Sequence, residues 1–493
     1  MADKMQRFID IERAMPDKRD VDHRQTDFDE IYRSFSTDQA EHQASRCEQC
    51  GIPFCQIHCP LQNNIPDWLK LSAEGRLEEA YHVSQATNTF PEICGRICPQ
   101  DRLCEGSCVL EQSKHGTVTI GAVEKYITDT AWAEGWVEPP HPVDGERDQS
   151  VGIIGAGPGG LAAADLLRRD GYDVHVYDRY DRVGGLMIYG IPGFKLEKHI
   201  VQQRAAHFEQ AGVTFHMNFE VGRDATLAEL RNRHDAILIA TGVYKARDIM
   251  LPGAGLDGVV PALDFLTASN RKGLGDSVPD FDSGKLNALG KHVVVVGGGD
   301  TAMDCVRTAV RQGAKKISCL YRRDRANMPG SMNEVGHAEE EGVDFIWLSA
   351  PEAFLGDDHI NAVRASRMRL GLPDATGRQR PEPVEDSTFT LQPVEDSTFT
   401  LQADMAITAL GFEPEDLPTL FSEDALQVSR VGTITVNPTT QMSNLPGVFA
   451  AGDIVRGASL VVWAIKDGRD AAMAMHNYIQ AHAAAAALMR AAG

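Results

Sequence analysis

Eight of the ten cysteines fall within residues 47 to 108, and their grouping indicates metal chemistry. The first group lies in Cys47-Glu-Gln-Cys50-Gly-Ile-Pro-Phe-Cys55-Gln-Ile-His-Cys59-Pro60, and the second comprises Cys94, Cys98, Cys104 and Cys108. Iron–sulfur ligation needs several thiolates close together in loops, often beside a Cys-Pro such as Cys59-Pro60 or Cys98-Pro99. Structural zinc favours paired C-x2-C knuckles, and only Cys47 and Cys50 have that spacing. Two clusters of the 4Fe–4S type are therefore expected, with zinc a distant second.

The next stretch that can do chemistry is Val151-Gly-Ile-Ile-Gly-Ala-Gly-Pro-Gly-Gly160, which has the spacing G-x-G-x-x-G. In such a turn Gly155 permits the tight bend, Gly157 lets a pyrophosphate approach the backbone, and Gly160 lets helix and strand pack closely. The following helix offers free N–H groups and a partial positive charge to the phosphates. Asp178 ends the next strand, about twenty residues on, where a carboxylate can accept from a ribose hydroxyl. These features predict a dinucleotide site that suits FAD.

Later segments are expected to complete the FAD site. Gly184 and Gly185 allow a close backbone approach along a ribityl chain, and Asp453 can accept from ribityl hydroxyls at the end of a buried strand. The helix that starts near Val462 has a dipole that stabilises negative charge on a reduced flavin. The predicted FAD residues are Gly155, Gly157, Pro158, Gly160, Asp178, Gly184, Gly185, Leu186, Thr241, Gly242, Gly452 and Asp453.

A second glycine turn lies in His292-Val-Val-Val-Val-Gly-Gly-Gly-Asp-Thr-Ala302, again between a β-branched strand and a helix. The next strand ends in Arg322-Arg323 instead of an acid. Guanidinium groups bind a 2′-phosphate through charge-assisted hydrogen bonds, whereas a carboxylate would repel it. This turn is therefore expected to bind NADPH. The alternative interpretation is that Arg322 and Arg323 are merely surface residues at a strand end. The predicted NADPH residues are Gly297, Gly298, Gly299, Asp300, Thr301, Arg322 and Arg323.

The elements that must position these residues place the chain in the α/β class. We expect two Rossmann-like dinucleotide-binding domains, as in glutathione-reductase-like flavoproteins, preceded by a helical iron–sulfur domain. The expected domains are a helical two-cluster domain (1–145), a discontinuous FAD-binding domain (146–285 and 410–493) and an NADPH-binding domain (286–409).

Finer features of the chain can also be predicted. Helical periodicity predicts helices around residues 66–71, 77–81 and 120–127, and a helical lead-in that carries Phe28, Ile31, Tyr32 and Phe35. Residues 383–392 and 393–402 are an identical tandem decamer, of which one copy should form a strand and the other a surface loop.

Composition narrows the function. The net charge of −22 argues against binding to nucleic-acid backbones or anionic membrane surfaces. The first twenty residues lack a signal-peptide core, and no apolar run approaches the ~20 residues of a membrane helix. A cytoplasmic protein is therefore expected, and a reducing compartment disfavours disulfides among the cysteines.

Together these motifs resemble the small (beta) subunits of NADPH-dependent glutamate synthases. The resemblance rests on the cysteine groups, Gly155-Ala-Gly-Pro-Gly-Gly160, Gly297-Gly-Gly-Asp-Thr-Ala302, Tyr321-Arg-Arg323 and Ala451-Gly-Asp453. The same domain set occurs in the N-terminal half of dihydropyrimidine dehydrogenase and in a bifurcating ferredoxin–NADP reductase subunit. The tandem decamer departs from the family pattern.

The resemblance implies interlaced clusters. Cys47, Cys50, Cys55 and Cys108 would hold one cluster, and Cys59, Cys98 and Cys104 would begin the other. Its fourth ligand is either Cys94 or Glu124, because relatives use an oxygen or amide ligand at the helix position that matches Glu124.

The resemblance also implies an NADPH-dependent oxidoreductase in a hetero-oligomer. Hydride would pass from NADPH to FAD directly, with no catalytic residue, and the clusters would conduct electrons to a large (alpha) subunit that makes L-glutamate from L-glutamine and 2-oxoglutarate. One alternative keeps the NADPH/FAD/Fe–S reductase but gives it ferredoxin or a pyrimidine-reducing partner. Another is a non-enzymatic scaffold whose cysteines bind zinc.

Overall fold

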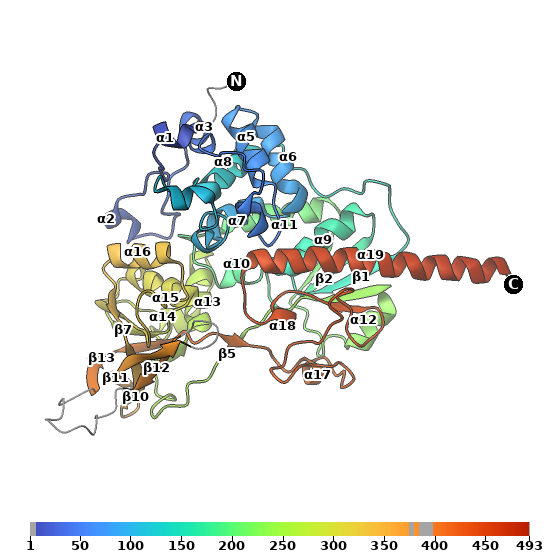
Figure 1. The fold of residues 1–493 in the computed structure, drawn as a ribbon. Helices are drawn as coiled ribbons and strands as arrows, with labels where there is room; N and C mark the ends of the chain where they lie inside the picture. The colour runs from blue at the N-terminus through green and yellow to red at the C-terminus, as the bar shows by residue number, and fades with distance from the viewer. Residues whose placement is uncertain (1–5, 374–378, 384–397, 493) are drawn as a thin grey trace.

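The computed structural model describes residues 6–373, 379–383 and 398–492. Figure 1 shows a helical N-terminal unit above two α/β units that lie side by side. The main helices of the N-terminal unit, here called the cysteine unit, are α3 (Thr37–Ala44), α5 (Ile65–Ala73), α6 (Leu77–Thr87), α7 (Pro91–Ile97) and α8 (Ile120–Ala133). These helices pack around Trp68 and Tyr81, which are fully buried. The helices predicted around 66–71, 77–81 and 120–127 are confirmed.

Further helices and short strands connect the main elements. Those of the cysteine unit are α1 (Arg7–Asp10), α2 (Val21–Arg24), α4 (Phe54–Ile57), η2 (Gln100–Arg102) and η3 (Val109–Ser113). The remaining connecting elements are α10 (Leu186–Tyr189), α11 (Lys198–Gln210), α12 (Leu227–Arg233), β5 (Lys245–Ala246), α14 (Pro279–Asp282), β15 (Phe412–Glu413), α17 (Leu417–Leu420) and α18 (Asp453–Arg456).

The lead-in between α2 and α3 is extended, so the helix predicted through Phe28, Ile31, Tyr32 and Phe35 is wrong. Its backbone pairs with the preceding segment instead: the Arg33 N–H donates to the Asp17 carbonyl, and the Arg19 N–H donates to the Ile31 carbonyl. Ile31 and Phe35 are buried, as core residues should be. Tertiary pairing has overridden the helical spacing, and the first helix after it begins only at the Ser36 capping box.

The first α/β unit is built on a parallel sheet with strand order β16-β4-β1-β2-β3. Its strands are β1 (Ser150–Ile154), β2 (Asp173–Asp178), β3 (Thr214–Met217), β4 (Ala236–Ile239) and β16 (Val448–Ala450). The long helix α19 (Val461–Ala492) runs across α9 (Pro158–Arg169) (Figure 1). The two helices approach so closely that a Cβ on Gly468 would lie 2.0 Å from the Gly159 carbonyl oxygen, so only glycine fits at this position.

The second α/β unit repeats the arrangement with strand order β6-β14-β7-β8-β9. Its strands are β6 (Val259–Pro261), β7 (His292–Val296), β8 (Lys316–Leu320), β9 (Asp344–Ile346) and β14 (Met405–Thr408), and its helices are α13 (Ala262–Gly273), α15 (Asp300–Arg311) and α16 (Met332–Glu340). An antiparallel sheet of β10 (Ser349–Gly356), β11 (Ile360–Pro373), β12 (Gln379–Pro383) and β13 (Thr398–Gln402) extends from it. The predicted α/β class with two Rossmann-like units is thus confirmed.

The predicted boundary at residues 285 and 286 divides elements that belong together. β6 pairs with β14 in the second sheet, and α13 packs into the same core. Both precede residue 286, so we propose that the second unit begins before β6. The sequence missed this because β6 is three residues long and its partner lies about 150 residues away.

The tandem decamer is only partly described. The end of its second copy forms β13, which pairs with β11. Most of the first copy, for which a loop or strand was predicted, lies outside the described residues.

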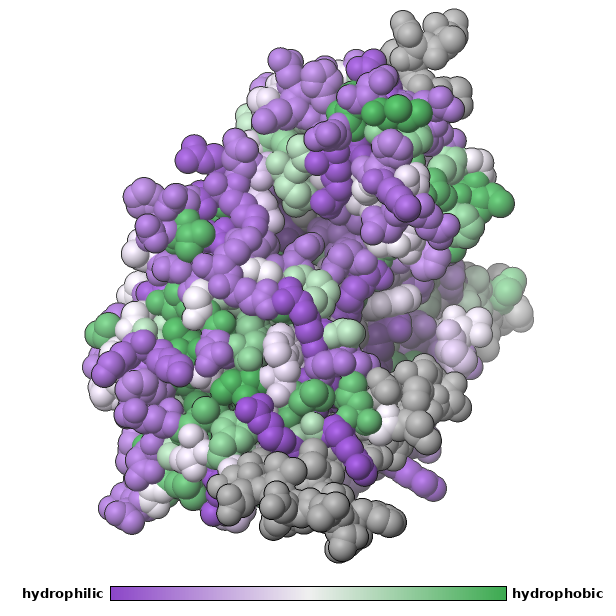
Figure 2. Space-filling view, turned by 60° about the vertical axis from the view of Figure 1, so that its left-hand side comes forward, coloured by the Kyte–Doolittle hydropathy of each residue, from purple (hydrophilic) through white to green (hydrophobic). Residues whose placement is uncertain are grey.

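No described helix is long and apolar enough to cross a membrane. Hydrophilic side chains cover much of the face in Figure 2, in keeping with the net charge of −22.

Candidate functional site

The eight clustered cysteines surround two cavities in the cysteine unit. Cys47, Cys50, Cys55 and Cys108 line the first thiol cavity, although Cys108 is 53 positions beyond Cys55. The second thiol cavity is lined by Cys59, Cys94, Cys98, Cys104 and Glu124. Within the described ranges, no three His, Cys, Asp or Glu side chains are grouped as they would be around one metal ion. The two cavities divide the cysteines into the sets named above, with both Cys94 and Glu124 beside the second, while their ligation of clusters stays a prediction.

The chemistry of these cavities fits a metal cluster. Burial raises the pKa of Cys47 to about 11 and that of Cys55 to about 12, and it raises the pKa of Cys104 well above the ordinary value. Of the described residues that line the two cavities, none is Lys, Arg or His. A bound cation is therefore needed to make these thiols into thiolates, as iron would do.

Glu124 lies wholly inside the cysteine unit. Burial raises the pKa of its carboxyl group to about 8, and the Ser84 hydroxyl and Asn88 amide donate to it over 3.4 and 3.3 Å. Cys94 is 4% exposed, and its thiol contacts Asn88 Oδ1 at 3.7 Å. Both residues line the second thiol cavity, and both remain candidates for its fourth ligand.

The first glycine turn joins β1 to α9 and leaves room for a ligand. A Cβ on Gly155 would lie 2.4 Å from the Ala240 carbonyl oxygen, and one on Gly160 would lie 2.0 Å from the Gly155 carbonyl oxygen. No atom lies within 4 Å of the Cβ position of Gly157. Gly155 and Gly160 are therefore required by packing, while Gly157 keeps open the space that a pyrophosphate would enter.

Asp178 organises this turn. Its two carboxylate oxygens accept the backbone N–H groups of Ala156 and Tyr180, at 2.7 and 2.8 Å. Burial raises the pKa of the carboxyl group despite these two hydrogen bonds. Each oxygen keeps a further lone pair, so the group can hold the turn and accept from a ribose hydroxyl as well.

The other predicted FAD residues border the same turn. Gly185 has a φ of 54°, and a Cβ on it would lie 2.9 Å from the Gly157 Cα atom. Thr241 Oγ1 is buried without a hydrogen-bond partner, which is unusual for a buried hydroxyl. A dinucleotide phosphate or hydroxyl would satisfy it. The remaining predicted FAD residues adjoin these: Pro158 begins α9, Gly184 and Leu186 flank Gly185, and Gly242 follows Thr241.

Asp453 lies at the start of α18, after Gly452. Burial raises the pKa of its carboxyl group to about 6, and hydrogen bonds from Ser459 oppose the shift. This contact ties Asp453 to the segment that leads into α19.

The second glycine turn joins β7 to α15 and is built differently. A Cβ on Gly298 would lie 2.3 Å from the Tyr321 ring, while Gly299 has no atom within 4 Å of its Cβ position. Asp300 Oδ1 accepts the Ser331 N–H at 2.8 Å, which holds the following loop over the helix start. Gly297 and Thr301 flank this open position.

The structure separates the two arginines that were predicted to bind a 2′-phosphate. Arg322 is exposed at the end of β8. Arg323 is only 6% exposed, and its guanidinium contacts the Tyr321 hydroxyl at 3.4 Å. Arg322 alone is therefore placed to meet a ligand from solvent, whereas Arg323 is buried.

A cavity of about 250 Å³, here called the junction cavity, lies where the three units meet. The cysteine unit contributes Cys98, the first α/β unit contributes Lys195 and Val461, and the second contributes Asp300 and Asp304. Cys98 also lines the second thiol cavity. The start of α19, the start of α15 and Cys98 therefore border one cavity. Lys195 and Asp304 were not among the predicted site residues.

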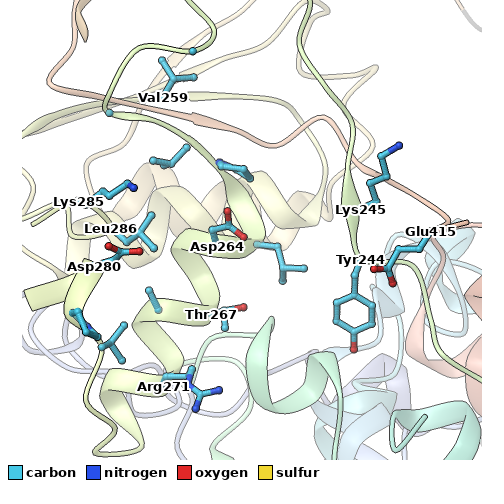
Figure 3. A pocket seen from close by; sticks show the side chains of 18 of the residues that line it. Tyr244, Lys245, Val259, Asp264, Thr267, Arg271, Asp280, Lys285, Leu286 and Glu415 are labelled. Atoms are coloured by element: carbon cyan, nitrogen blue, oxygen red, sulfur yellow. The ribbon is translucent and has the colours of Figure 1, made fainter. Parts of the chain in front are cut away.

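A wider cleft of about 1260 Å³ separates the two α/β units (Figure 3). Asp264, Thr267 and Arg271 line it from α13, and Tyr244 and Glu415 line it from the opposite side. Arg179, next to Asp178, forms a bidentate ion pair with Glu415 at 2.9 Å. Sequence reasoning missed this pair because its partners are 236 positions apart.

Two family descriptions match the chain. "Dihydropyrimidine dehydrogenase domain II, 4Fe-4S cluster" matches residues 24–136, and "pyridine nucleotide-disulphide oxidoreductase" matches residues 149–468. The first coincides with the thiol cavities and the second spans both glycine turns.

Curated relatives match nearly the whole chain. The glutamate synthase [NADPH] small chain of Azospirillum brasilense is 64% identical over 482 residues, 98% of each chain. The protein of that name from Escherichia coli K12 is 44% identical over 97% of this chain and 100% of its own length. Among solved structures, Mycobacterium tuberculosis FprA in complex with NADPH matches with a TM-score of 0.57 and 19% identity, covering 69% of this chain and 86% of its own. That structural likeness concerns the fold alone.

Proposed function

The chain belongs to the family of glutamate synthase [NADPH] small chains, and on this premise we propose that it is the electron-input subunit of a glutamate synthase. In this role it oxidises NADPH with the help of FAD and iron–sulfur clusters. The electrons go to a large subunit that makes L-glutamate from L-glutamine and 2-oxoglutarate.

The observation that carries the proposal is the junction cavity. It brings the first turn of α15, the entry to α19 and Cys98 to one cavity, although they lie in three different units. A reductase that links a nicotinamide, a flavin and a metal cluster needs this convergence, because each carrier must lie close to the next. A structural zinc scaffold would not need it.

The residues of the chain bind and orient the cofactors, which supply the redox chemistry themselves. When bound, FAD accepts hydride from NADPH and gives up its electrons one at a time. Around it, Gly157 and the start of α9 receive the pyrophosphate, Asp178 fixes the turn, and Thr241 gains the partner that its hydroxyl lacks. In the second unit, Gly299 leaves room for the NADPH pyrophosphate and Arg322 meets the 2′-phosphate.

We assign a 4Fe–4S cluster to each thiol cavity. Cys47, Cys50, Cys55 and Cys108 would hold one, and Cys59, Cys98 and Cys104 would hold the other with either Cys94 or Glu124. Support comes from their shared cavities, which none of the described Lys, Arg or His residues lines.

Matched variants decide the fourth ligand. Cys94→Ala and Glu124→Ala, neither of which leaves a ligating atom, are compared for iron content and for the electron paramagnetic resonance signal of the reduced clusters. The variant that removes a true ligand should lose or alter one cluster signal, and the other should keep both. Loss of neither signal in either variant would contradict the assignment of this cavity.

The partner is tested by anaerobic co-purification of the chain from its native cells. We expect a large subunit that, together with this chain, converts glutamine and 2-oxoglutarate to glutamate with NADPH. Recovery with ferredoxin or a pyrimidine-binding subunit instead would keep the reductase and refute glutamate synthesis. A chain that contains zinc, without flavin or acid-labile sulfide, would refute the reductase itself.

A further inference from the structure

Lys195 places a buried positive charge at the junction cavity. It follows Phe194 in the loop between α10 and α11, its side chain is 14% exposed, and it lines the cavity opposite the start of α19. Its ammonium group contacts Asp304 Oδ1 at 3.0 Å and Glu334 Oε2 at 3.9 Å. The lysine belongs to the first α/β unit, and both carboxylates belong to the second.

The carboxylates are themselves held by other groups. Glu334 accepts from Arg307 at 2.6 Å and contacts His337 Nδ1 at 3.2 Å. His337 in turn contacts the Tyr32 hydroxyl at 2.9 Å, which brings the lead-in into the same network. Asp304 is 7% exposed. The positions of the charges that face Lys195 are therefore fixed by the second unit and the lead-in.

The other cationic side chains near the cavity interact with other groups. Arg96 and Lys125 also line the junction cavity, and both form ion pairs with Glu30. Lys198 is half-buried one turn further on, but it donates to the backbone carbonyls of Met187 and Ile191 and does not line the cavity. Of the described cations around the cavity, Lys195 is the one whose charge is balanced across the interface between the two α/β units.

The expected ligand of this cavity changes charge when it is reduced. A hydride carries two electrons and one proton, so an oxidised flavin that accepts it gains one negative charge. The positive end of α19 faces the same space. In a buried site, an ammonium group at short range interacts strongly with such a charge, because the effective dielectric constant is low.

We propose that Lys195 stabilises the negative charge of the reduced flavin, and that Asp304 and Glu334 moderate this effect from the second unit. This inference rests on the proposed function and takes the flavin ring to lie in the junction cavity, beside the start of α19. It makes the reduction potential of the flavin depend on the position of the unit that binds NADPH. Displacement of that unit would remove the two carboxylates from Lys195 and favour the reduced flavin.

The test is the flavin midpoint potential, measured by anaerobic spectroelectrochemistry on the full-length protein with its cofactors. Lys195→Met should lower the ratio of reduced to oxidised flavin at a fixed potential at least tenfold, a shift of about −30 mV for two electrons. Lys195→Arg should keep the wild-type potential. Asp304→Asn removes the opposing charge but keeps a hydrogen-bond acceptor, and it should shift the potential in the positive direction.

Lys18→Met is the matched control. It breaks a 2.7 Å ion pair to Glu340 of the same second unit, but Lys18 does not line the junction cavity, so the potential should not change. Opposite shifts for Lys195→Met and Asp304→Asn are the expected result, and a purely structural role would not produce them. Unchanged potentials, or shifts of the same sign, would overturn the inference while the flavin spectrum still upholds the proposed function. If Lys195→Met fails to retain flavin, the sign of the potential shift in Asp304→Asn tests the inference by itself.

Discussion

The two glycine turns share one backbone arrangement and differ in what holds them in place. In each, a parallel strand leads through three small residues into a helix, and the third position of the turn, Gly157 or Gly299, stays open for a ligand. The first turn is fixed by a charge, because Asp178 accepts the Ala156 N–H. The second is fixed by packing, because the Tyr321 ring fills the space beside Gly298.

This difference shows how one fold can bind two dinucleotides. A carboxylate at the first turn suits a ribose with free hydroxyl groups, and its charge is also needed to hold the turn. At the second turn an aromatic ring replaces the carboxylate, so the strand end is free to carry the exposed guanidinium of Arg322. The specificity of each turn thus follows from how its backbone is stabilised.

The largest expected effect comes from the last small residue of each turn. Gly160→Ala would place a methyl group 2.0 Å from a backbone oxygen, so the protein should lose its flavin and about 3 kcal/mol of stability. Ala302→Gly, at the matching position of the second turn, should cost only about 1 kcal/mol and keep NADPH binding. Flavin content and thermal unfolding measure both. Equal damage from the two variants would show that the turns are not built as described.

Arg322→Ala should weaken NADPH binding by roughly 10- to 100-fold, because a charged hydrogen bond contributes about 1.5–3 kcal/mol. NADH binding should change little. Arg323→Ala serves as the comparison: its guanidinium is buried, so it should reduce stability without changing the preference for NADPH over NADH. Titration with both nucleotides distinguishes them, and an equal loss for NADPH and NADH in Arg322→Ala would refute the 2′-phosphate assignment.

Asp178→Asn should weaken flavin retention by about tenfold. The amide has only one oxygen for the two N–H groups of Ala156 and Tyr180, so one donor is left facing an NH2 group, at a cost of about 1–3 kcal/mol. Binding of NADPH at the second turn should be unaffected. Flavin release by equilibrium dialysis measures the effect, and full flavin affinity in this variant would contradict the role of the carboxylate in holding the first turn.

Thr241→Val is expected to have the smallest effect. Because the hydroxyl is buried without a partner in the ligand-free chain, its removal should stabilise the flavin-free protein by about 1 kcal/mol. The same change should weaken FAD binding severalfold. Unfolding of the apo and flavin-loaded forms is compared, and a loss of stability in the apo form would contradict this account.

The strand–turn–helix units could be predicted from the sequence because each signal is local. Glycine spacing, β-branched runs and the start of a helix all occur within about twenty residues. The interlaced thiol groups were predicted from family resemblance, which placed Cys108 with Cys47, Cys50 and Cys55. These features depend little on distant parts of the chain.

The features that could not be predicted from the sequence depend on contacts between distant residues. The lead-in through Phe28 and Ile31 has helical spacing but pairs with the segment before it. Arg322 and Arg323 are adjacent arginines, and only the folded structure makes the first exposed and the second buried. Lys195 lies in a loop that carries no predicted site residue, and only the fold brings Asp304 and Glu334 to it.

The most direct test of the central claim is an anaerobic titration of the purified chain, with its flavin and iron determined, using NADPH and then NADH. The account predicts that NADPH bleaches the flavin absorption at far lower concentration than NADH. It also predicts that the chain takes up more electrons than the flavin alone can hold, because the clusters accept the remainder. A chain that retains flavin and iron but is not reduced by NADPH, or that prefers NADH, would contradict the assignment of the two turns.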